Sequence, residues 1–297
     1  MKLFASIYIL FSIFSVHALY LVPNNGEAIN PQEKQKKHLP SQGPMARSFN
    51  YTKQTNHQLL QFQKHFTPQH SGSFEYFKDL KIDTHFNLSS FDDSFLQSSG
   101  HFSNYGLTLS SSVTNKLSIG ITYNRSDYES GGLTNISAHS DGLSLFGHYR
   151  INDNYGFGAF IFYDALDIER QDGDSWSKGG GLIFTTWHDL GSNFDVSTVT
   201  ALSKSYIPGS HDSNLTSTAR LGKNWDNFTI GLSATYSDSI RSNNGADNGD
   251  DSSFWQFGAD ISWMINKSLV LTVGYEKTEA LKHYDDDTLT VDLGWTF

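Results

Sequence analysis

The sequence predicts an all-β protein: a transmembrane antiparallel up-and-down β-barrel of about 12 strands. Three observations predict this fold. The last ten residues, 288–297 (TLTVDLGWTF), alternate between an apolar and a polar face and end on an aromatic residue. Similar alternating segments recur from about residue 77 onward, and short turns alternate with longer polar loops between them. A strand with one wholly apolar face is a sticky edge in water, whereas a closed membrane barrel has no edge.

The N-terminus predicts a cleaved Sec-type signal peptide over residues 1–18. Lys2 supplies the positive charge, residues 3–16 form an apolar core, and Val16-His17-Ala18 resembles a cleavage site. This core is shorter than the roughly 20 apolar residues that a membrane-spanning helix needs. The pattern therefore favours export over a helical membrane anchor.

Residues 19–76 are expected to form a polar leader ahead of the barrel. The segment 31–40 (PQEKQKKHLP) is basic, and the whole leader is too short and too polar to build a core. Within it, residues 54–66 place Leu59, Phe62 and Phe66 on one helical stripe. We expect this segment to form either a helix in the pore or part of a disordered periplasmic leader.

The barrel domain is expected at 77–297, where apolar residues occupy every second position. The regular apolar faces fall at 80–88, 105–109, 117–123, 143–149, 155–163, 215–221, 228–236, 255–263, 269–275 and 289–297. Two more strands, near 177–187 and 194–204, alternate less regularly, and the first contains Gly179-Gly180-Gly181. Strands of roughly 9–11 residues suffice for a tilted membrane crossing.

The connections between these strands alternate in length. Short turns are expected at 114–116, 152–154, 189–192, 225–227 and 266–267. Longer polar loops are expected near 91–102, 127–140, 165–175, 205–213, 239–252 and 278–286. This is the pattern of bacterial outer-membrane barrels, with periplasmic turns, extracellular loops and both barrel ends in the periplasm. A secreted β-sandwich is the alternative, but it does not explain the short-long alternation.

The composition agrees with a membrane barrel. Aromatic residues make up 14% of the chain and hydrophobic residues only 37%, as expected where strands are half polar and carry aromatic girdles. The chain has no cysteine, which excludes disulfides and thiolate metal sites. The net charge of −10 argues against nucleic acid as a partner.

The strand faces opposite the apolar ones carry ionisable side chains of mixed sign. In a barrel these faces line the lumen. The residues are Lys81, Asp83, His85, His148, Arg150, Arg220, Asp260, Glu276 and Asp292. They predict either a structural polar network that holds the barrel and any plug, or a wet, selective pore.

The sequence predicts no catalytic, cofactor or metal site. His139, Ser140 and Asp141 have the residue types of a nucleophilic triad, but adjacent positions do not give its geometry. The acidic runs 247–251 and 285–287 lack the spacing of a calcium loop and are expected to be solvated loops. The three glycines 179–181 are not followed by a helix or by Lys-Ser/Thr, so they are not a phosphate loop. In a strand they indicate a bend or the close approach of a plug.

The chain resembles the β-domain of autotransporters, the type V secretion translocators. The resemblance lies in 117–127 (LSIGITYNRSD), 140–153 (SDGLSLFGHYRIND), 155–163 and the closing 288–297, and it covers about residues 77–297. It implies a 12-stranded barrel with a helix through the pore. It also implies assembly by the barrel assembly machinery with periplasmic chaperones, with Gly294, Trp295 and Phe297 as the assembly signal. Autotransporters carry a long passenger, whereas only about 58 residues separate Ala18 from the first strand here.

Three functions remain open from the sequence. The first is a translocator or surface-anchoring barrel with a very short or absent passenger. The second is a passive porin-like channel for small solutes. The third is a surface interaction protein that acts through its acidic extracellular loops. All three place the chain in the outer membrane of a Gram-negative bacterium, among lipid and lipopolysaccharide.

Overall fold

The computed structural model describes residues 80–93, 98–132, 136–168, 175–207, 210–242, 253–279 and 284–297. These residues form twelve β-strands. The strands are β1 (Lys81–Asp93), β2 (Ser98–Ser112), β3 (Leu117–Gly132), β4 (Ile136–Arg150), β5 (Tyr155–Ile168), β6 (Ser175–Gly191), β7 (Phe194–Ile207), β8 (Ser210–Trp225), β9 (Phe228–Ser242), β10 (Ser253–Asn266), β11 (Leu269–Glu279) and β12 (Tyr284–Thr296). The expected signal peptide and leader, and the pore helix expected at 54–66, lie outside the described residues.

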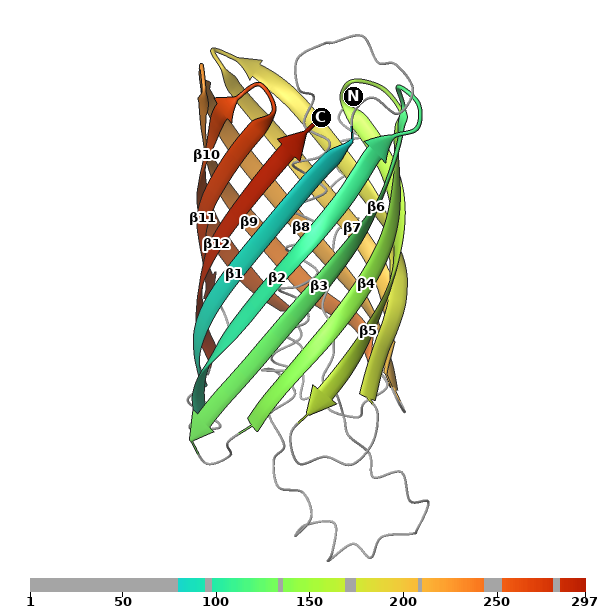
Figure 1. Cartoon of the computed structure of the whole chain (residues 1–297), viewed down its shortest axis with the longest axis vertical. Coiled ribbons are helices and arrows are strands. Elements are labelled where there is room, and N and C mark those ends of the chain that lie inside the picture. Colours follow the sequence, from blue (N-terminus) through green and yellow to red (C-terminus); the bar gives the residue numbers. More distant parts are fainter. Residues whose placement is uncertain are drawn as a thin grey trace, which may run out of the picture.

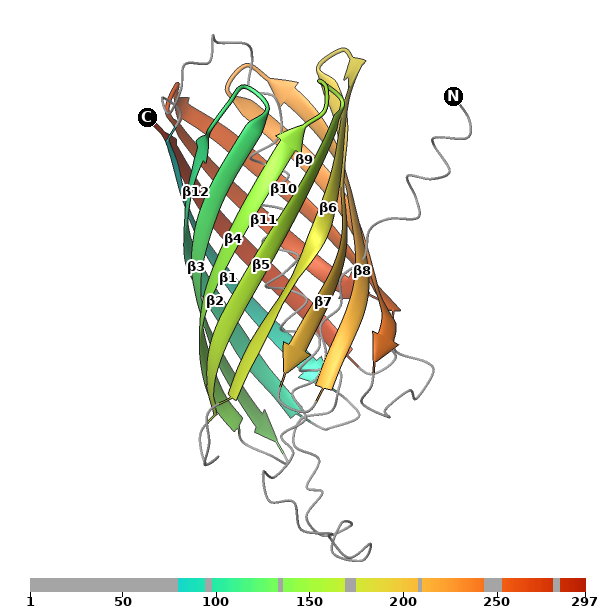
Figure 2. The same cartoon turned by 90° about the vertical axis from the view of Figure 1, so that its right-hand side faces the viewer.

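Each strand pairs antiparallel with its sequence neighbours, and β12 pairs with β1 to close a barrel. Figures 1 and 2 show the strands tilted around one closed wall. The closing seam is continuous from Lys81–Thr296 to Asp93–Tyr284, and the Phe297 N–H donates to the Leu80 carbonyl at 2.9 Å. The predicted fold class and the strand count are therefore confirmed. The two ends of the barrel wall lie side by side, as an even strand count requires.

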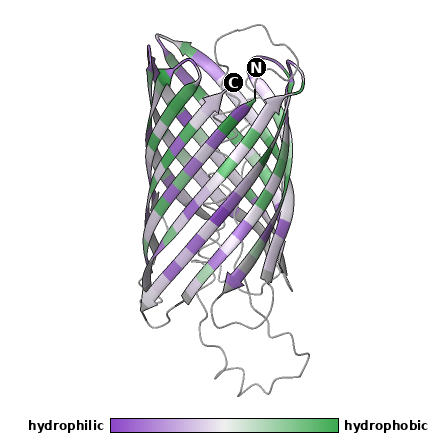
Figure 3. Cartoon of the chain, in the orientation of Figure 1, coloured by the Kyte–Doolittle hydropathy of each residue, from purple (hydrophilic) through white to green (hydrophobic). Residues whose placement is uncertain are grey.

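The outer surface of the barrel carries an apolar belt. Along β12, Leu289, Leu293 and Trp295 point outward with 40–51% of their surface exposed, while the alternate Asp292 is buried on the inside. The alternating bands along the strands in Figure 3 follow this period of two. A soluble fold would bury such a face, whereas lipid is the solvent that suits it.

Tyrosines mark the edge of the belt toward the longer loops. The Tyr123 hydroxyl donates to Asp141 Oδ1 at 2.5 Å, and the Arg125 guanidinium lies 3.7 Å from the same carboxylate. Elsewhere on the same outer surface, the Tyr275 hydroxyl of β11 donates to Asp287 of β12. Phenol rings at the apolar boundary with their hydroxyls among charged groups are typical of a membrane interface.

The strands run for 11–17 residues, longer than the 9–11 expected from the sequence. The excess lies at the end of the longer loops, so the loops expected at 91–102 and 127–140 are largely strand. On this part of β3 the outward side chains are Arg125, Asp127 and Glu129. The hydrogen-bonded ladder continues there without an apolar face, and therefore the apolar pattern underestimates strand length.

Inside the barrel, large side chains lie over glycines of neighbouring strands. Phe146 faces Gly120, Phe160 faces Gly181, and in each pair an added Cβ on the glycine would come within 3 Å of the ring. The same arrangement brings Phe91 to Gly100, Phe162 to Gly179, His85 to Gly106, Asp195 to Gly222 and Asp83 to Gly294. A glycine therefore provides the space for each ring or carboxylate at the inner wall.

Candidate functional site

The lumen wall is the candidate site because it gathers most of the buried polar and charged side chains of the strands. Every ionisable residue predicted for the lumen lies on the inward face of its strand. Three inward carboxylates were missed: Asp164, Asp195 and Asp286 are all buried on this face. The alternation of side chains along β5 and β12 is enough to predict that Asp164 and Asp286 face inward. Asp195 lies in β7, whose sequence alternates irregularly, so the same pattern does not predict its orientation.

Acidic groups outnumber basic groups on the described lumen wall. The inward acids are Asp83, Asp164, Asp195, Asp260, Glu276, Asp286 and Asp292. The inward bases are Lys81, Arg150 and Arg220, joined by the imidazoles of His85 and His148. A low-dielectric wall with this surplus of carboxylates produces a negative potential that attracts cations or a basic segment.

Arg220 and Asp260 form a short, well-aligned ion pair on the described wall. Arg220 Nε donates to Asp260 Oδ1 at 2.9 Å and Arg220 Nη2 donates to Oδ2 at 2.7 Å, a bidentate geometry. The two side chains are only 15% and 18% exposed. They reach each other across β9 at Gly231, where an added Cβ would lie 2.3 Å from Arg220 Nη2.

A second network joins the first three strands. His85 Nε2 lies 3.0 Å from Asn104 Oδ1, and Asn104 Nδ2 donates to Ser126 Oγ at 2.9 Å. Asn87 Nδ2 donates to the same Asn104 oxygen at 3.5 Å. All four side chains are buried. This network ties the inner faces of β1, β2 and β3 together beside the closing seam.

The remaining predicted lumen residues are held by separate local contacts. Lys81 Nζ lies 3.4 Å from Asp83 on the same strand. His148 Nε2 lies 2.9 Å from Thr185 Oγ1, and Glu276 accepts a hydrogen bond from Gln256 at 2.9 Å.

Arg150 lies near the short-turn end of the wall, where its guanidinium donates to the Asn115 carbonyl at 2.8 Å. Asp292 lies in register with His85 across the closing seam. The nine predicted residues thus share one inner wall without converging on a single centre.

An apolar strip interrupts the polar wall on β4–β7. Phe146, Phe160, Ile183, Val199 and Ala201 form one buried cluster, with Phe162 packed against it. These side chains point inward, since the outward positions of the same strands carry a different set, including Leu182 and Leu202. The lumen wall of β4–β7 therefore combines an apolar cluster with polar and charged inward side chains such as His148, Asp164 and Asp195.

The predicted assembly signal lies at the end of the closing strand. Trp295 and Phe297 stack on the outer surface with ring centroids 5.0 Å apart and are 51% and 58% exposed. Gly294 faces inward, where an added Cβ would lie 2.6 Å from Asp83 Oδ1. Both rings are accessible from outside the barrel, and their recognition by an assembly factor stays a prediction.

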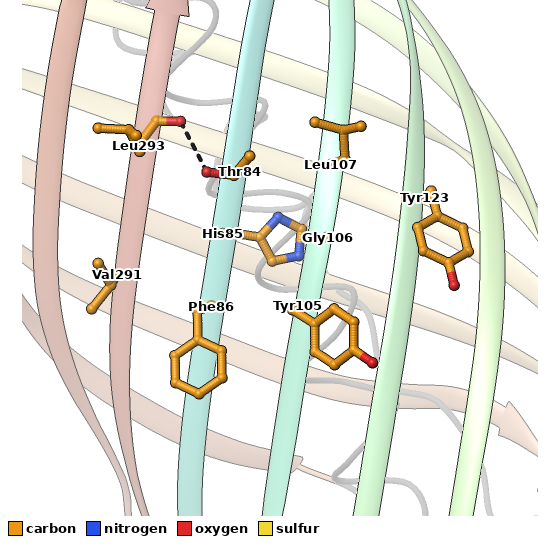
Figure 4. A pocket seen from close by; sticks show the side chains of 9 residues that line it. All are labelled: Thr84, His85, Phe86, Tyr105, Gly106, Leu107, Tyr123, Val291 and Leu293. Carbon is orange, nitrogen blue, oxygen red and sulfur yellow. Dashed lines mark hydrogen bonds between the residues drawn. The ribbon is translucent and has the colours of Figure 1, made fainter.

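A shallow depression lies on the outer surface over β12, β1, β2 and β3. Figure 4 shows it between Phe86, Tyr105 and Leu293, with the His85 ring beside Gly106. Thr84 donates to the Leu293 carbonyl at 3.5 Å along its edge. The lining side chains are mostly apolar and outward-facing, so the depression belongs to the apolar belt and brings no reactive group together.

The three residues that resemble a triad do not form one. His139 and Asp141 lie on the outward face of β4, and Ser140 lies on the opposite face, because successive strand residues alternate. His139 Nε2 pairs with Asp167 at 3.5 Å, and Asp141 accepts from Tyr123. The imidazole is therefore directed away from the Ser140 hydroxyl.

Two features are absent from the described part of the chain. It contains no group of three or more His, Cys, Asp or Glu side chains placed to hold a metal ion. It also contains no helix long and apolar enough to cross a bilayer.

Comparison with known proteins identifies similar structures but no sequence relative. No protein-family model and no curated protein matches the chain. The translocator domain of the autotransporter NalP from Neisseria meningitidis superposes with a TM-score of 0.59 at 10% identity, covering 84% of this chain and 96% of that one. The β-domain of the Bordetella autotransporter BrkA gives a TM-score of 0.59 at 10% identity, covering 74% and 100%. An outer membrane channel from Pseudomonas putida F1 gives 0.55 at 13% identity, covering 77% and 99%.

These likenesses define the class of fold. The described residues form a closed twelve-stranded barrel whose fold is of the bacterial outer-membrane type. More particularly, its fold resembles that of autotransporter translocator domains, as predicted from the sequence. At identities near 10% the likeness concerns the fold alone, and an outer-membrane channel shares it.

Proposed function

We propose that the chain is an outer-membrane barrel that anchors or exports its own N-terminal segment, residues 19–76, through its lumen. Charge complementarity carries this proposal. The leader has six Lys or Arg against three Asp or Glu, whereas residues 77–297 have 14 against 28. Since carboxylates outnumber bases on the described lumen wall, a basic segment is the occupant that this wall attracts.

The apolar strip on β4–β7 supports the same occupant. Residues 54–66 carry Leu59, Phe62 and Phe66 at helical spacing, with polar residues between them. A helix of this kind presents one face that suits Phe146 and Phe160 and another that suits the polar wall. The apolar cluster and the polar side chains around it thus match the two faces of the segment.

We further propose that the short turns and Phe297 lie in the periplasm and the longer loops outside the cell. The closing strand, with Gly294, Trp295 and Phe297, is then the part that the assembly machinery and periplasmic chaperones read. The exposed Trp295–Phe297 stack suits that role because the rings are accessible before lipid covers them.

Charge reversal in the leader tests whether it occupies the lumen. The full chain with Lys34, Lys36 and Lys37 changed to Glu is expected to conduct severalfold more in planar bilayers than the unmodified chain, because an acidic leader is repelled by the acidic wall. A control outside the leader changes two lysines, Lys116 and Lys267, which lie exposed in short turns, to Glu. Equal conductance of all three proteins would show that the leader does not occupy the pore.

Single cysteines test orientation and export, since the natural chain has none. A membrane-impermeant maleimide on intact cells is expected to label Asn248→Cys, between β9 and β10, and not Asn115→Cys, between β2 and β3. Labelling of Asn24→Cys in the leader indicates export to the surface. Labelling of Asn115→Cys instead of Asn248→Cys would reverse the orientation and refute the proposal.

A passive channel for small solutes is the second candidate function. The surplus of inward carboxylates favours it, because such a wall makes an open pore selective for cations. The conductance experiment separates the two functions. An unmodified chain that already conducts cations, unchanged by the leader substitutions, is a channel.

A further inference from the structure

Two lysines and three aromatic rings form a patch on the outer surface of β5, β6 and β7. The outer lysine patch consists of Lys178, Lys204, Trp176, Tyr206 and Tyr163. Lys178 is in register with Tyr163 on one side and Tyr206 on the other. Lys204 is in register with Gly180, two residues along β6 from Lys178, so the two lysines are diagonal neighbours on one face.

Both ammonium groups are held over rings at the long-loop end of the barrel. Lys178 Nζ lies 4.7 Å from the centroid of the Trp176 ring, and Lys204 Nζ lies 5.0 Å from that of Tyr206. In each strand the ring lies closer to the long-loop end than the lysine does. The side chains therefore bend away from the apolar belt, as lysines do when they bring their charge to a membrane interface.

This patch differs from the rest of the outer rim. Elsewhere the outward charges beyond the belt are largely acidic or paired, as with Arg125 between Asp127 and Asp141. Within the described residues, no ion pair involves Lys178 or Lys204. The patch is thus a positive spot on a rim whose other charges are mainly negative.

Beside Lys204, and on the belt side of Lys178, the surface is apolar and open. Ile161 and Leu182 are 61% and 50% exposed, and Gly180 between them carries no side chain. A molecule that lies here meets hydrocarbon on the belt side and two cations on the loop side. That order matches one lipid molecule, with its acyl chains on the belt and an anionic headgroup at the rim.

We propose that the outer lysine patch binds the phosphorylated headgroup of a glycolipid in the leaflet at the long-loop end. The two compact ammonium charges attract phosphate, and aromatic rings such as Trp176 and Tyr206 are typical of the membrane–water interface where the headgroup lies. The inference rests on the orientation proposed above, in which that leaflet is the outer one. It does not depend on what occupies the lumen, because the patch lies on the opposite side of the wall.

Native mass spectrometry of the full chain in detergent, titrated with diphosphorylated lipid A, tests the proposal. The double variant Lys178→Gln/Lys204→Gln is expected to bind this lipid roughly thirtyfold more weakly, because it loses the attraction of two basic side chains to an anionic headgroup. Dephosphorylated lipid A is expected to bind the unmodified chain as weakly as lipid A binds the variant. A heat-modifiable gel shift verifies that the variant is folded.

The matched control is Lys223→Gln/Lys277→Gln, which removes the same charge. Lys223 lies at the short-turn end and donates to the Ser192 carbonyl at 2.6 Å, and Lys277 is in register with Asp287. This control is expected to change lipid A binding by less than about twofold. Equal weakening by both double variants, or equal binding of the dephosphorylated lipid, would overturn the proposal. Because this binding is measured in detergent, its failure is distinct from a failure of the cysteine labelling or of the conductance test.

Discussion

Replacing Asp260 with alanine is expected to lower the free energy of unfolding by about 3 kcal/mol, because it leaves the largely buried charge of Arg220 without its main partner. The carboxylate accepts both guanidinium bonds, at 2.9 and 2.7 Å, and the two side chains are largely shielded from water. Asp195 also lies near Arg220 around Gly222 and partly compensates the charge. The expected cost is therefore at the lower end for a broken buried pair. The midpoint of urea unfolding in detergent, followed by tryptophan fluorescence, measures it.

Two further variants make this result specific. Asp127→Asn breaks the exposed contact with Arg125, at 3.9 Å, and is expected to cost less than about 1 kcal/mol. The double variant Arg220→Met/Asp260→Leu also removes the guanidinium charge that Asp260→Ala leaves without its main partner, and it is expected to recover most of the loss. A cost for Asp260→Ala no larger than for Asp127→Asn would show that water in the lumen screens the pair.

The architecture of the wall was predictable from the sequence because lipid outside and polar groups inside impose a period of two. Leu289, Val291 and Leu293 belong on the outside for the same reason that Asp292 belongs inside, and no tertiary information is needed to see this. Strand length was not predictable in the same way. Beyond the belt, Asp127 and Glu129 face water on the outside, and the apolar pattern ends before the ladder does.

The partners within the lumen could not be read from the sequence. Arg220 and Asp260 are forty residues apart and lie on strands that are not neighbours, so their contact depends on the stagger of β8, β9 and β10. Gly231 is what allows it, and a glycine in a strand gives no hint of which side chain will cross it. The sequence thus predicts which residues face the lumen but not which of them meet.

The glycines at 179–181 illustrate the same limit. A bend or the close approach of a plug was expected there. The structure gives a reason within the wall itself: Gly179 and Gly181 face inward under Phe162 and Phe160, and Gly180 faces outward. The irregular alternation of this segment follows, because the inward Ile183 belongs to the apolar strip of the lumen. An apolar residue on the inside breaks the period-two pattern that the outside imposes.

Replacing Gly181 with alanine is accordingly expected to destabilise the barrel by about 2 kcal/mol, within the range for overpacking. The new Cβ would lie 2.4 Å from the Leu202 carbonyl oxygen and 2.9 Å from the Phe160 ring, and the carbonyl belongs to the β6–β7 ladder and cannot retreat. Alanine loses less backbone entropy on folding than glycine does, and this gain offsets only about 0.5–1 kcal/mol of the strain. Urea unfolding in detergent measures the net change.

Gly147→Ala is the matched control, because Gly147 faces outward and the nearest atom to its new Cβ would be the Ser118 oxygen at 3.9 Å. With no strain to oppose it, the entropic gain should leave this variant as stable as the natural chain or up to about 1 kcal/mol more stable. Phe160→Leu in the Gly181→Ala background should recover only part of the loss, since it relieves the ring and not the carbonyl. Equal stability of the two alanine variants would mean that the inner wall can accommodate a methyl group at position 181. Glycine would then not be required beside the inward aromatic rings.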